Sequence, residues 1–401
     1  MKSANRNTRR DVVGATLLLV VLTVLCPWSG MSATQAGDLN PPPGPVAPTM
    51  KPLTDLEPRI AINATNTPGD ADSLFRIAQP GSYYLTGNIT GVSGKMGIEI
   101  AAGGVTIDLM GFELAGVPGS LDGIATTPAV VRSAIIHNGI LRDWGGDGIQ
   151  GPSQVALLSD LQLINNANHG ISGGSDYVVT RCSAFGNGGD GIVVALGSVV
   201  KDCTSVINNG RGIVTQSGCV ISGCTASANT GDGITTLSGS TVTACASHNN
   251  QGGSGFVAGG NCTLTGCTAN ANLGAGIVAG SQSTITGCTV TSNRFDGIVV
   301  GSNSRVTDNL SSSNGNGGQG AGIVTGGNSS RIEGNTVSGN DIGIILDGAV
   351  TGNIVVRNSA TFNSTNYINP AIGNFIGTII TGSAAMNAAS NGLVNISFSG
   401  L

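Results

Sequence analysis

The sequence contains few aromatic and few charged residues. Only 3% of its 401 residues are Phe, Trp or Tyr, and only 10% are Asp, Glu, Lys or Arg. A chain so poor in aromatic residues cannot build an ordinary globular core of this size, and it lacks a platform on which nucleic-acid bases could stack. The net charge is −5 and the sequence has no stripe of basic residues, so it lacks the positively charged surface to which nucleic acids bind. No nucleic-acid partner is therefore predicted.

The residues that are abundant are small or β-branched. The chain has 65 Gly, and 40% of it is hydrophobic. That hydrophobic fraction, together with the low net charge, excludes a disordered chain. Regularly placed Val and Ile among Gly, Ser, Thr and Asn indicate a repeat protein.

A Gly-Ile pair recurs along most of the chain, and Phe replaces Ile once. Between Gly170 and Gly297 every step is 21 or 22 residues, and the longer steps elsewhere fit loop insertions on single coils. The pairs begin at Gly97, Gly123, Gly148, Gly170, Gly191, Gly212, Gly233, Gly255, Gly276, Gly297, Gly322 and Gly343.

The spacing predicts an all-β solenoid of about twelve coils. Each coil has short β-branched strands separated by Gly, Asn and Ser turns. One coil cannot bury its few apolar side chains alone, but stacked coils can, because each Ile then lies on the Ile of the coil below. An Asn row recurs four residues before the Gly, and stacked Asn side chains can bond to each other within a turn.

The repeat resembles the right-handed parallel β-helix of the pectin-lyase-like superfamily of secreted proteins. The resemblance runs from about Gly81 to about Asn358, and the segments 81–89 and 105–112 are similar to the first coils of many such proteins. It implies a single-stranded right-handed parallel β-helix with terminal caps. The paired aspartate motif and the Arg-Ile-Lys of the polygalacturonases are absent.

The repeat and the flanking composition predict five segments. They are a signal peptide at 1–36, a Pro-rich linker at 37–60, an N-terminal cap at 61–96, the β-helix at 97–358 and a C-terminal cap at 359–401. The first segment has the basic start, the short apolar stretch and the small residues of an export signal.

We therefore expect a secreted, periplasmic or cell-surface protein that has no membrane segment after cleavage. An uncleaved anchor is the alternative. We also expect a monomer.

Six of the nine cysteines share one row with the 21-residue period, from Cys182 to Cys288. The row predicts a ladder of reduced, buried thiols, since Cys behaves as a small hydrophobic residue in a core. Vertical disulfides are the alternative. No metal site is predicted, because no His shares the row, and no cofactor is predicted.

The position before each repeat Gly carries the residues best suited to chemistry. Carboxylates, an imidazole and a guanidinium in one line suit proton transfer on a uronate polymer and the holding of its carboxylate groups. The predicted catalytic residues are Asp147, His169, Asp190 and Arg211.

Four further residues are predicted to contact substrate. Asp122 and Asp232 belong to the same line, Arg181 belongs to a second line, and Trp144 could stack on a sugar ring. The structural alternative is that Asp before Gly caps backbone N–H groups at a coil corner.

Two functions follow from these patterns. The first is binding or processing of an extracellular polysaccharide of the uronate type, as a lyase, an epimerase or a glycoside hydrolase if the protein is an enzyme. The alternative is a non-catalytic surface scaffold of the adhesin kind. Polysaccharide is the expected partner in the first case.

Overall fold

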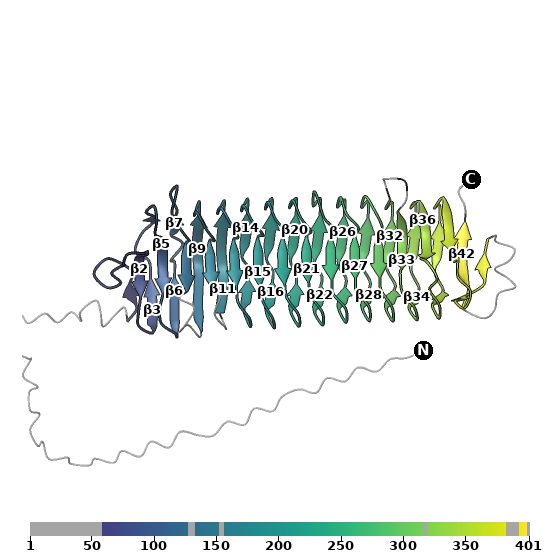
Figure 1. Cartoon of the computed structure of the whole chain (residues 1–401), viewed down its shortest axis with the longest axis horizontal. Coiled ribbons are helices and arrows are strands. Elements are labelled where there is room, and N and C mark those ends of the chain that lie inside the picture. The colour runs from purple at the N-terminus through teal and green to yellow at the C-terminus, as the bar shows by residue number, and fades with distance from the viewer. Residues whose placement is uncertain are drawn as a thin grey trace, which may run out of the picture. The chain divides into compact units, whose positions relative to one another are not determined.

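The computed structural model describes residues 58–126, 133–151, 156–315, 318, 320–381 and 393–398, and these residues form strands and no helix. A typical coil has three strands of three residues each, such as β12 (Ile171–Gly173), β13 (Val178–Thr180) and β14 (Ser183–Phe185). Each of these three strands pairs in parallel with the equivalent strand of the next coil, and Figure 1 shows this stacking along the protein.

Sheet B contains the Gly-Ile positions and has one strand from each of fourteen coils. Its strands in order are β2 (Ser73–Ile77), β5 (Met96–Ile100), β8 (Ile124–Thr126), β10 (Ile149–Gly151), β12, β15 (Ile192–Val194), β18 (Ile213–Thr215), β21 (Ile234–Thr236), β24 (Phe256–Ala258), β27 (Ile277–Ala279), β30 (Ile298–Val300), β33 (Ala321–Thr325), β36 (Ile342–Leu346) and β39 (Thr365–Ile368).

Sheet A contains the other two strands of each coil. One column has β1 (Ile60–Ala61), β3 (Gly81–Tyr84), β6 (Val105–Asp108), β9 (Ala134–Arg142), β11 (Ala156–Ile164), β13, β16 (Val199–Lys201), β19 (Val220–Ser222), β22 (Thr241–Thr243), β25 (Thr263–Thr265), β28 (Thr284–Thr286), β31 (Arg305–Thr307), β34 (Arg331–Glu333), β37 (Ile354–Val356) and β40 (Phe375–Ile376).

The second column of sheet A shares the long strands β9 and β11, which run through both columns. Its other strands are β4 (Ile89–Thr90), β7 (Glu113–Ala115), β14, β17 (Thr204–Val206), β20 (Thr225–Ser227), β23 (Ala246–His248), β26 (Thr268–Asn270), β29 (Thr289–Thr291), β32 (Leu310–Ser312), β35 (Thr336–Ser338), β38 (Ser359–Thr361), β41 (Ile379–Ile380) and β42 (Asn395–Phe398).

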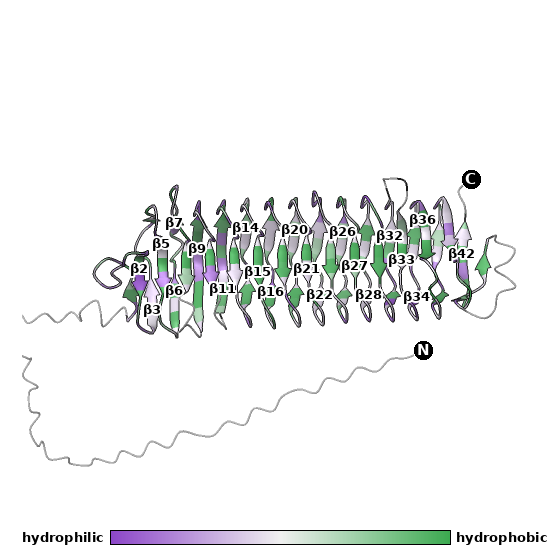
Figure 2. Ribbon diagram, in the orientation of Figure 1, coloured by the Kyte–Doolittle hydropathy of each residue, from purple (hydrophilic) through white to green (hydrophobic). Residues whose placement is uncertain are grey.

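Side chains alternate between the core and solvent along each strand. In β15, Ile192 and Val194 are buried and Val193 faces outward, whereas in β16 only the central Val200 is buried. Hydrophobic positions therefore recur in the strands of successive coils (Figure 2). In these two strands, one side chain of the sheet B strand and two of the sheet A strand therefore face outward.

The corner between the second column of sheet A and sheet B contains a ladder of buried asparagines. The Asn229 amide donates to the side-chain oxygen of Asn250 at 3.1 Å and to the Ser205 carbonyl at 3.0 Å, and its own oxygen accepts from the amide of Asn208. The same arrangement recurs at Asn166, Asn187, Asn272, Asn293, Asn314 and Asn340. This ladder satisfies backbone groups that the turns would leave unpaired inside the core.

The predicted cysteine row lies inside the coils at the corner between the two columns of sheet A. The eight cysteines among the described residues are free and buried, and Asn309 and Asn335 continue the row. The Cys203 thiol donates to the Lys201 carbonyl at 3.2 Å. The hydrogen bond to a neighbouring thiol, followed by burial, raises the pKa of Cys203 and of Cys224 to about 12. The thiols thus serve as small, weakly donating core residues.

The prediction of an all-β parallel solenoid is confirmed, with fourteen strands in sheet B against about twelve expected coils. Stacked coils also extend beyond the expected range 97–358, because β2 pairs with β5 and β39 pairs with β36. The predicted signal peptide and all but the last residues of the predicted linker lie outside the described residues. Across the described part of the chain, no helix has the length and apolar character needed to cross a membrane.

Candidate functional site

The residues that precede the repeat Gly form a single line at the edge of sheet B, as the sequence predicts. In each coil the residue is followed by the repeat Gly and then by the sheet B strand. The line runs from Asp122, ahead of β8, to Asp232, ahead of β21. The line places Asp147, His169, Asp190 and Arg211 on consecutive coils.

Most side chains of this line accept a hydrogen bond from the backbone N–H of the residue at the equivalent position of the next coil. The Asp147 carboxylate accepts from His169 at 2.8 Å, His169 Nδ1 accepts from Asp190 at 2.9 Å, and the Asp190 carboxylate accepts from Arg211 at 2.6 Å. Asp122 and Asp232 do the same for Asp147 and Ser254. The line is therefore a capping ladder, which is the structural alternative that the sequence allowed.

Burial separates the four predicted catalytic residues into two pairs. Asp147 is 3% exposed, and this burial raises its pKa, against the hydrogen bond from the His169 amide that lowers it. The Asp190 carboxylate is largely buried and lies 3.0 Å from the Arg211 Nη2. Only His169 and Arg211 reach solvent to a substantial degree, and the Arg211 side chain is 41% exposed.

The four residues predicted to contact substrate differ in burial and position. Trp144 is 1% exposed and its indole N–H donates to the Leu114 carbonyl at 3.1 Å, so it cannot stack on a sugar ring and that prediction is wrong. Arg181 is exposed and binds Asp160 through two bonds of 2.7 and 2.8 Å. It stands between β13 and β14, at a different corner from the Asp-Gly-Ile line. Asp122 and Asp232 are half-buried members of that line.

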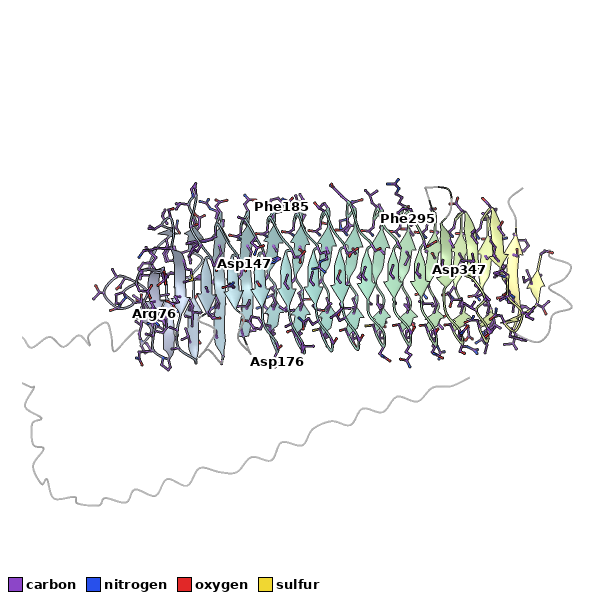
Figure 3. The ribbon with its side chains drawn as sticks, viewed as in Figure 1. Arg76, Asp147, Asp176, Phe185, Phe295 and Asp347 are labelled. Atoms are coloured by element: carbon purple, nitrogen blue, oxygen red, sulfur yellow. The ribbon has the colours of Figure 1, made fainter. Side chains whose placement is uncertain are left out.

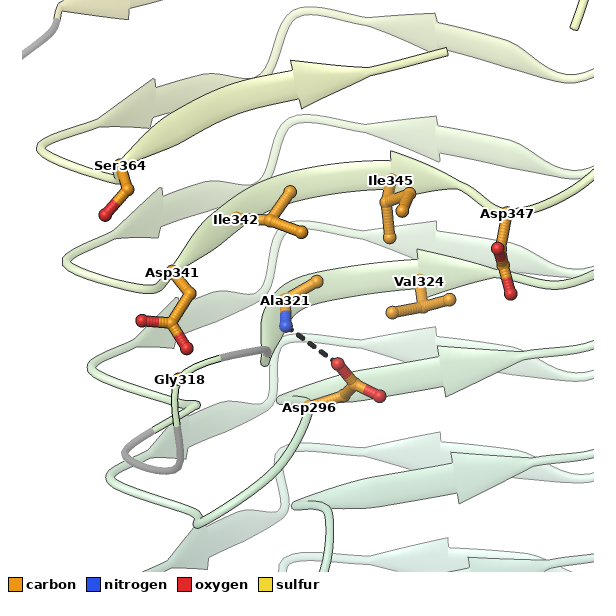
Figure 4. A pocket seen from close by; sticks show the side chains of 9 residues that line it. All are labelled: Asp296, Gly318, Ala321, Val324, Asp341, Ile342, Ile345, Asp347 and Ser364. Carbon is orange, nitrogen blue, oxygen red and sulfur yellow. Dashed lines mark hydrogen bonds between the residues drawn. The ribbon is translucent and has the colours of Figure 1, made fainter. Parts of the chain in front are cut away.

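A pocket of about 620 Å³ lies on the outer face of sheet B near its C-terminal end (Figure 4). Asp296, which precedes β30, and Asp341 and Asp347, at the two ends of β36, provide three carboxylates. Val324 from β33 and Ile345 from β36 line the apolar part between them. The pocket thus combines hydrogen-bond acceptors with an aliphatic surface.

Two of the pocket carboxylates also hold the chain around them. The Asp296 carboxylate accepts from the Ala321 amide at 2.7 Å, and the Asp341 carboxylate accepts from the Gly320 amide at 3.0 Å. Burial raises the pKa of Asp296, and the nearby charge of Asp347 raises it further. Asp347 itself is exposed. The pocket therefore contains carboxylates in unequal environments.

The pocket and the predicted catalytic line are separate places on sheet B. Figure 3 shows Asp147 and Asp347 in coils far apart along the stack. Nine strand-to-strand steps separate β10 from β36, which amounts to roughly 43 Å at about 4.8 Å per step. They cannot act on the same sugar unit.

Sequence reasoning missed the pocket. Asp341 and Asp347 lie outside the repeating line, and Asp296 belongs to it without being chosen. The available signal was the 25-residue step from Gly297 to Gly322, because the extra residues include Gly318 at the edge of the pocket.

No group of three or more His, Cys, Asp or Glu side chains is placed to hold a metal ion within the described ranges.

Solved structures with similar architecture share little sequence with this chain. The A-module of the mannuronan C-5 epimerase AlgE4 from Azotobacter vinelandii is 13% identical, with a TM-score of 0.44, over 80% of this chain and 89% of that one. Tailspike protein 3 of bacteriophage CBA120 is 13% identical, with a TM-score of 0.49, over 82% and 64%. The tailspike of E. coli bacteriophage HK620, solved with a pentasaccharide, is 13% identical with a TM-score of 0.43 over 87% and 79%.

Comparison with curated proteins gives no match. The model of the family described as "Right handed beta helix region" matches residues 88–251, 215–319 and 255–400, which together extend from 88 to 400. With its parallel coils and its 21-residue repeat, the chain belongs to this right-handed β-helix family.

Proposed function

We propose that this protein binds a polysaccharide along the outer face of sheet B, with the pocket around Asp296, Asp341 and Asp347 as the main contact. The observation that carries the proposal is the combination of three carboxylates with the aliphatic surface of Val324 and Ile345 in one hollow. Sugar hydroxyls donate hydrogen bonds to carboxylates, and such charge-assisted bonds are about twice as strong as neutral ones. The C–H face of a sugar ring packs against aliphatic side chains.

The chemistry of the pocket favours a neutral or amino-sugar polymer. Its three carboxylates repel an anionic sugar and attract a cationic one. Asp341 and Asp347 stand at opposite ends of β36, so a sugar ring lying on Ile345 has an acceptor on each side. The parallel strands of sheet B continue from the pocket along the stack, and a linear polymer fits that direction.

Affinity electrophoresis with the full chain tests this proposal. Gels containing neutral, amino-sugar or uronate polysaccharides are compared with a gel without polymer. We expect retardation by a neutral or amino-sugar polymer that free sugar of the same kind relieves. Unchanged mobility in every gel contradicts the proposal.

Action on a uronate polymer at His169 and Arg211 is the second candidate. It is favoured by the exposed part of the Arg211 side chain, which can hold a carboxylate, and by the His169 Nε2, which the capping ladder does not use. In this version Asp147 and Asp190 position those two residues. Incubation with uronate polymers, with detection of unsaturated products, new reducing ends or altered uronate composition, tests it. Activity that disappears in the Arg211→Ala variant supports it, and no turnover by the folded wild type contradicts it.

A non-catalytic surface scaffold is the third candidate function, and it is favoured by the use of the Asp-Gly-Ile line for backbone capping.

Export of the chain with removal of residues 1–36 is proposed with each of these functions. N-terminal sequencing of the protein recovered outside the cytoplasm tests that proposal, and a mature chain that still begins at Met1 contradicts it.

A further inference from the structure

The outer face of sheet A carries an in-register array of threonines on the neighbouring strands β22, β25 and β28. Each strand has the pattern Thr-x-Thr, and both threonines face outward. One column has Thr241, Thr263 and Thr284, and the second has Thr243, Thr265 and Thr286.

The array is periodic in two directions. Neighbouring strands lie about 4.8 Å apart, and two residues of one strand on the same face lie about 6.7 Å apart, from a rise of about 3.3 Å each. The residues between the threonines, Val242, Leu264 and Ile285, are at most 1% exposed and stack in the core. The buried stack holds the outer threonines at these spacings.

The threonine hydroxyls are directed to solvent. Among the described residues, Thr286 alone of the six has a side-chain hydrogen bond to protein, with the Thr307 hydroxyl at 2.9 Å. Thr side chains have restricted χ1 angles, so equivalent backbones favour the same orientation of hydroxyl and methyl group. The surface therefore presents one hydroxyl and one methyl group at each of the six threonine positions.

The corner residues beside the array are small and uncharged. The corner residues that follow its strands are Ala244, Gly266 and Gly287, whereas coils outside the array have Arg181, Asp202 and Asp308 at that corner. Along the two columns, Arg305 of β31 pairs in register with Thr284 and ends the array on one side, whereas Lys201 of β16 lies two strands beyond β22 on the other side. Uncharged strands and small, uncharged corner residues thus coincide at β22, β25 and β28.

We propose that this threonine array binds the surface of ice. A surface that repeats in two directions complements a ligand that also repeats in two directions, and the two spacings are close to the repeats of a prism face of hexagonal ice. Ordered water can fill the gaps between methyl groups and bond to the hydroxyls. The array has no charged or aromatic group with which to select a soluble ligand. It lies on sheet A and the pocket lies on sheet B, so the two proposals fail independently.

Thermal hysteresis and ice-recrystallisation inhibition by the purified full chain test this proposal. The variant Thr263→Lys places a long charged side chain in the centre of the array, and Thr204→Lys is the matched control on an outward, exposed position of β17. Thermal unfolding confirms that both variants fold. We expect the wild type and Thr204→Lys to slow ice growth, and Thr263→Lys to lose that activity.

Three results would overturn the proposal: no effect of the wild type on ice, equal activity of the two folded variants, or retention on crystalline cellulose or chitin that Thr263→Lys abolishes without any effect on ice. The last result assigns the array to a solid polymer surface instead.

Discussion

The imidazole Nδ1 of His169 accepts a hydrogen bond of 2.9 Å from the backbone N–H of Asp190. This bond requires Nδ1 without a proton, so the neutral ring has its proton on Nε2. His169 thus takes the capping role that aspartates have on the coils before and after it. An acceptor at this position has a structural function whether or not the ring also meets a substrate.

The variant His169→Ala is expected to destabilise the coil stack, because the Asp190 N–H loses its acceptor. The expected loss is about 1–2 kcal/mol in the free energy of unfolding. The matched variant His169→Asn retains an acceptor oxygen and is expected to keep most of the stability. Urea unfolding of the three proteins measures this difference, and equal losses in both variants contradict the capping role.

The buried asparagine ladder is expected to contribute more to the free energy of unfolding than any surface residue. Asn229 is fully buried, and its amide has partners in the coils on both sides. Its replacement in Asn229→Ala leaves several buried groups unpaired and is expected to cost about 3 kcal/mol. The neighbouring Asn209 is exposed, so Asn209→Ala is the control and is expected to change stability by less than about 0.5 kcal/mol. Thermal unfolding with similar midpoints for both variants would rule out a stabilising ladder.

Asp147 is expected to make the protein less stable as pH rises. Burial raises its pKa in the folded state, so the folded protein binds this proton more tightly than the unfolded chain does. The stabilising contribution is fully present below the unfolded pKa and is lost as pH rises through the folded pKa.

The variant Asp147→Asn tests this linkage, because it keeps an acceptor for the His169 amide. It also removes a negative charge that, after burial, helps to raise the pKa of Asp122. We expect the variant to be more stable than the wild type at neutral pH, with a difference that shrinks towards acid pH. Melting temperatures across that range provide the measurement, and a pH-independent difference argues against a buried, charged Asp147.

The thiol ladder is expected to be unreactive in the folded protein. The cysteines from Cys182 to Cys288 are at most 2% exposed, and the raised pKa of Cys203 and Cys224 keeps those two protonated at neutral pH. Alkylation with iodoacetamide, read by peptide mass mapping, should modify none of them before unfolding and all of them in denaturant. Modification under native conditions would show that the core opens, and disulfide-linked peptides would contradict the free thiols.

The fold could be predicted because one local pattern repeats. A Gly, an inward Ile and a corner Asn at fixed offsets determine the register of each coil, and the register determines which residues stack. The line containing His169 and Arg211 followed from that register, and the structure has it in the predicted order.

Burial and the pocket could not be predicted in the same way. The sequence does not show that the Trp144 ring points into the core, since that depends on the neighbouring coils near Leu114. Asp296, Asp341 and Asp347 line one pocket although they come from different coils, and Asp341 and Asp347 stand at positions that do not repeat, so the register does not predict their meeting.

Isothermal titration with the polysaccharide that retards the protein most strongly tests whether the pocket carboxylates bind that polymer. The protein is compared with Asp341→Asn, which changes a pocket carboxylate, and with Asp308→Asn, which changes an exposed carboxylate at a corner of sheet A. The loss of a charge-assisted hydrogen bond worth about 1.5 kcal/mol raises the dissociation constant about tenfold. We expect that loss for Asp341→Asn and an unchanged constant for Asp308→Asn; equal constants for all three proteins would contradict binding at the pocket.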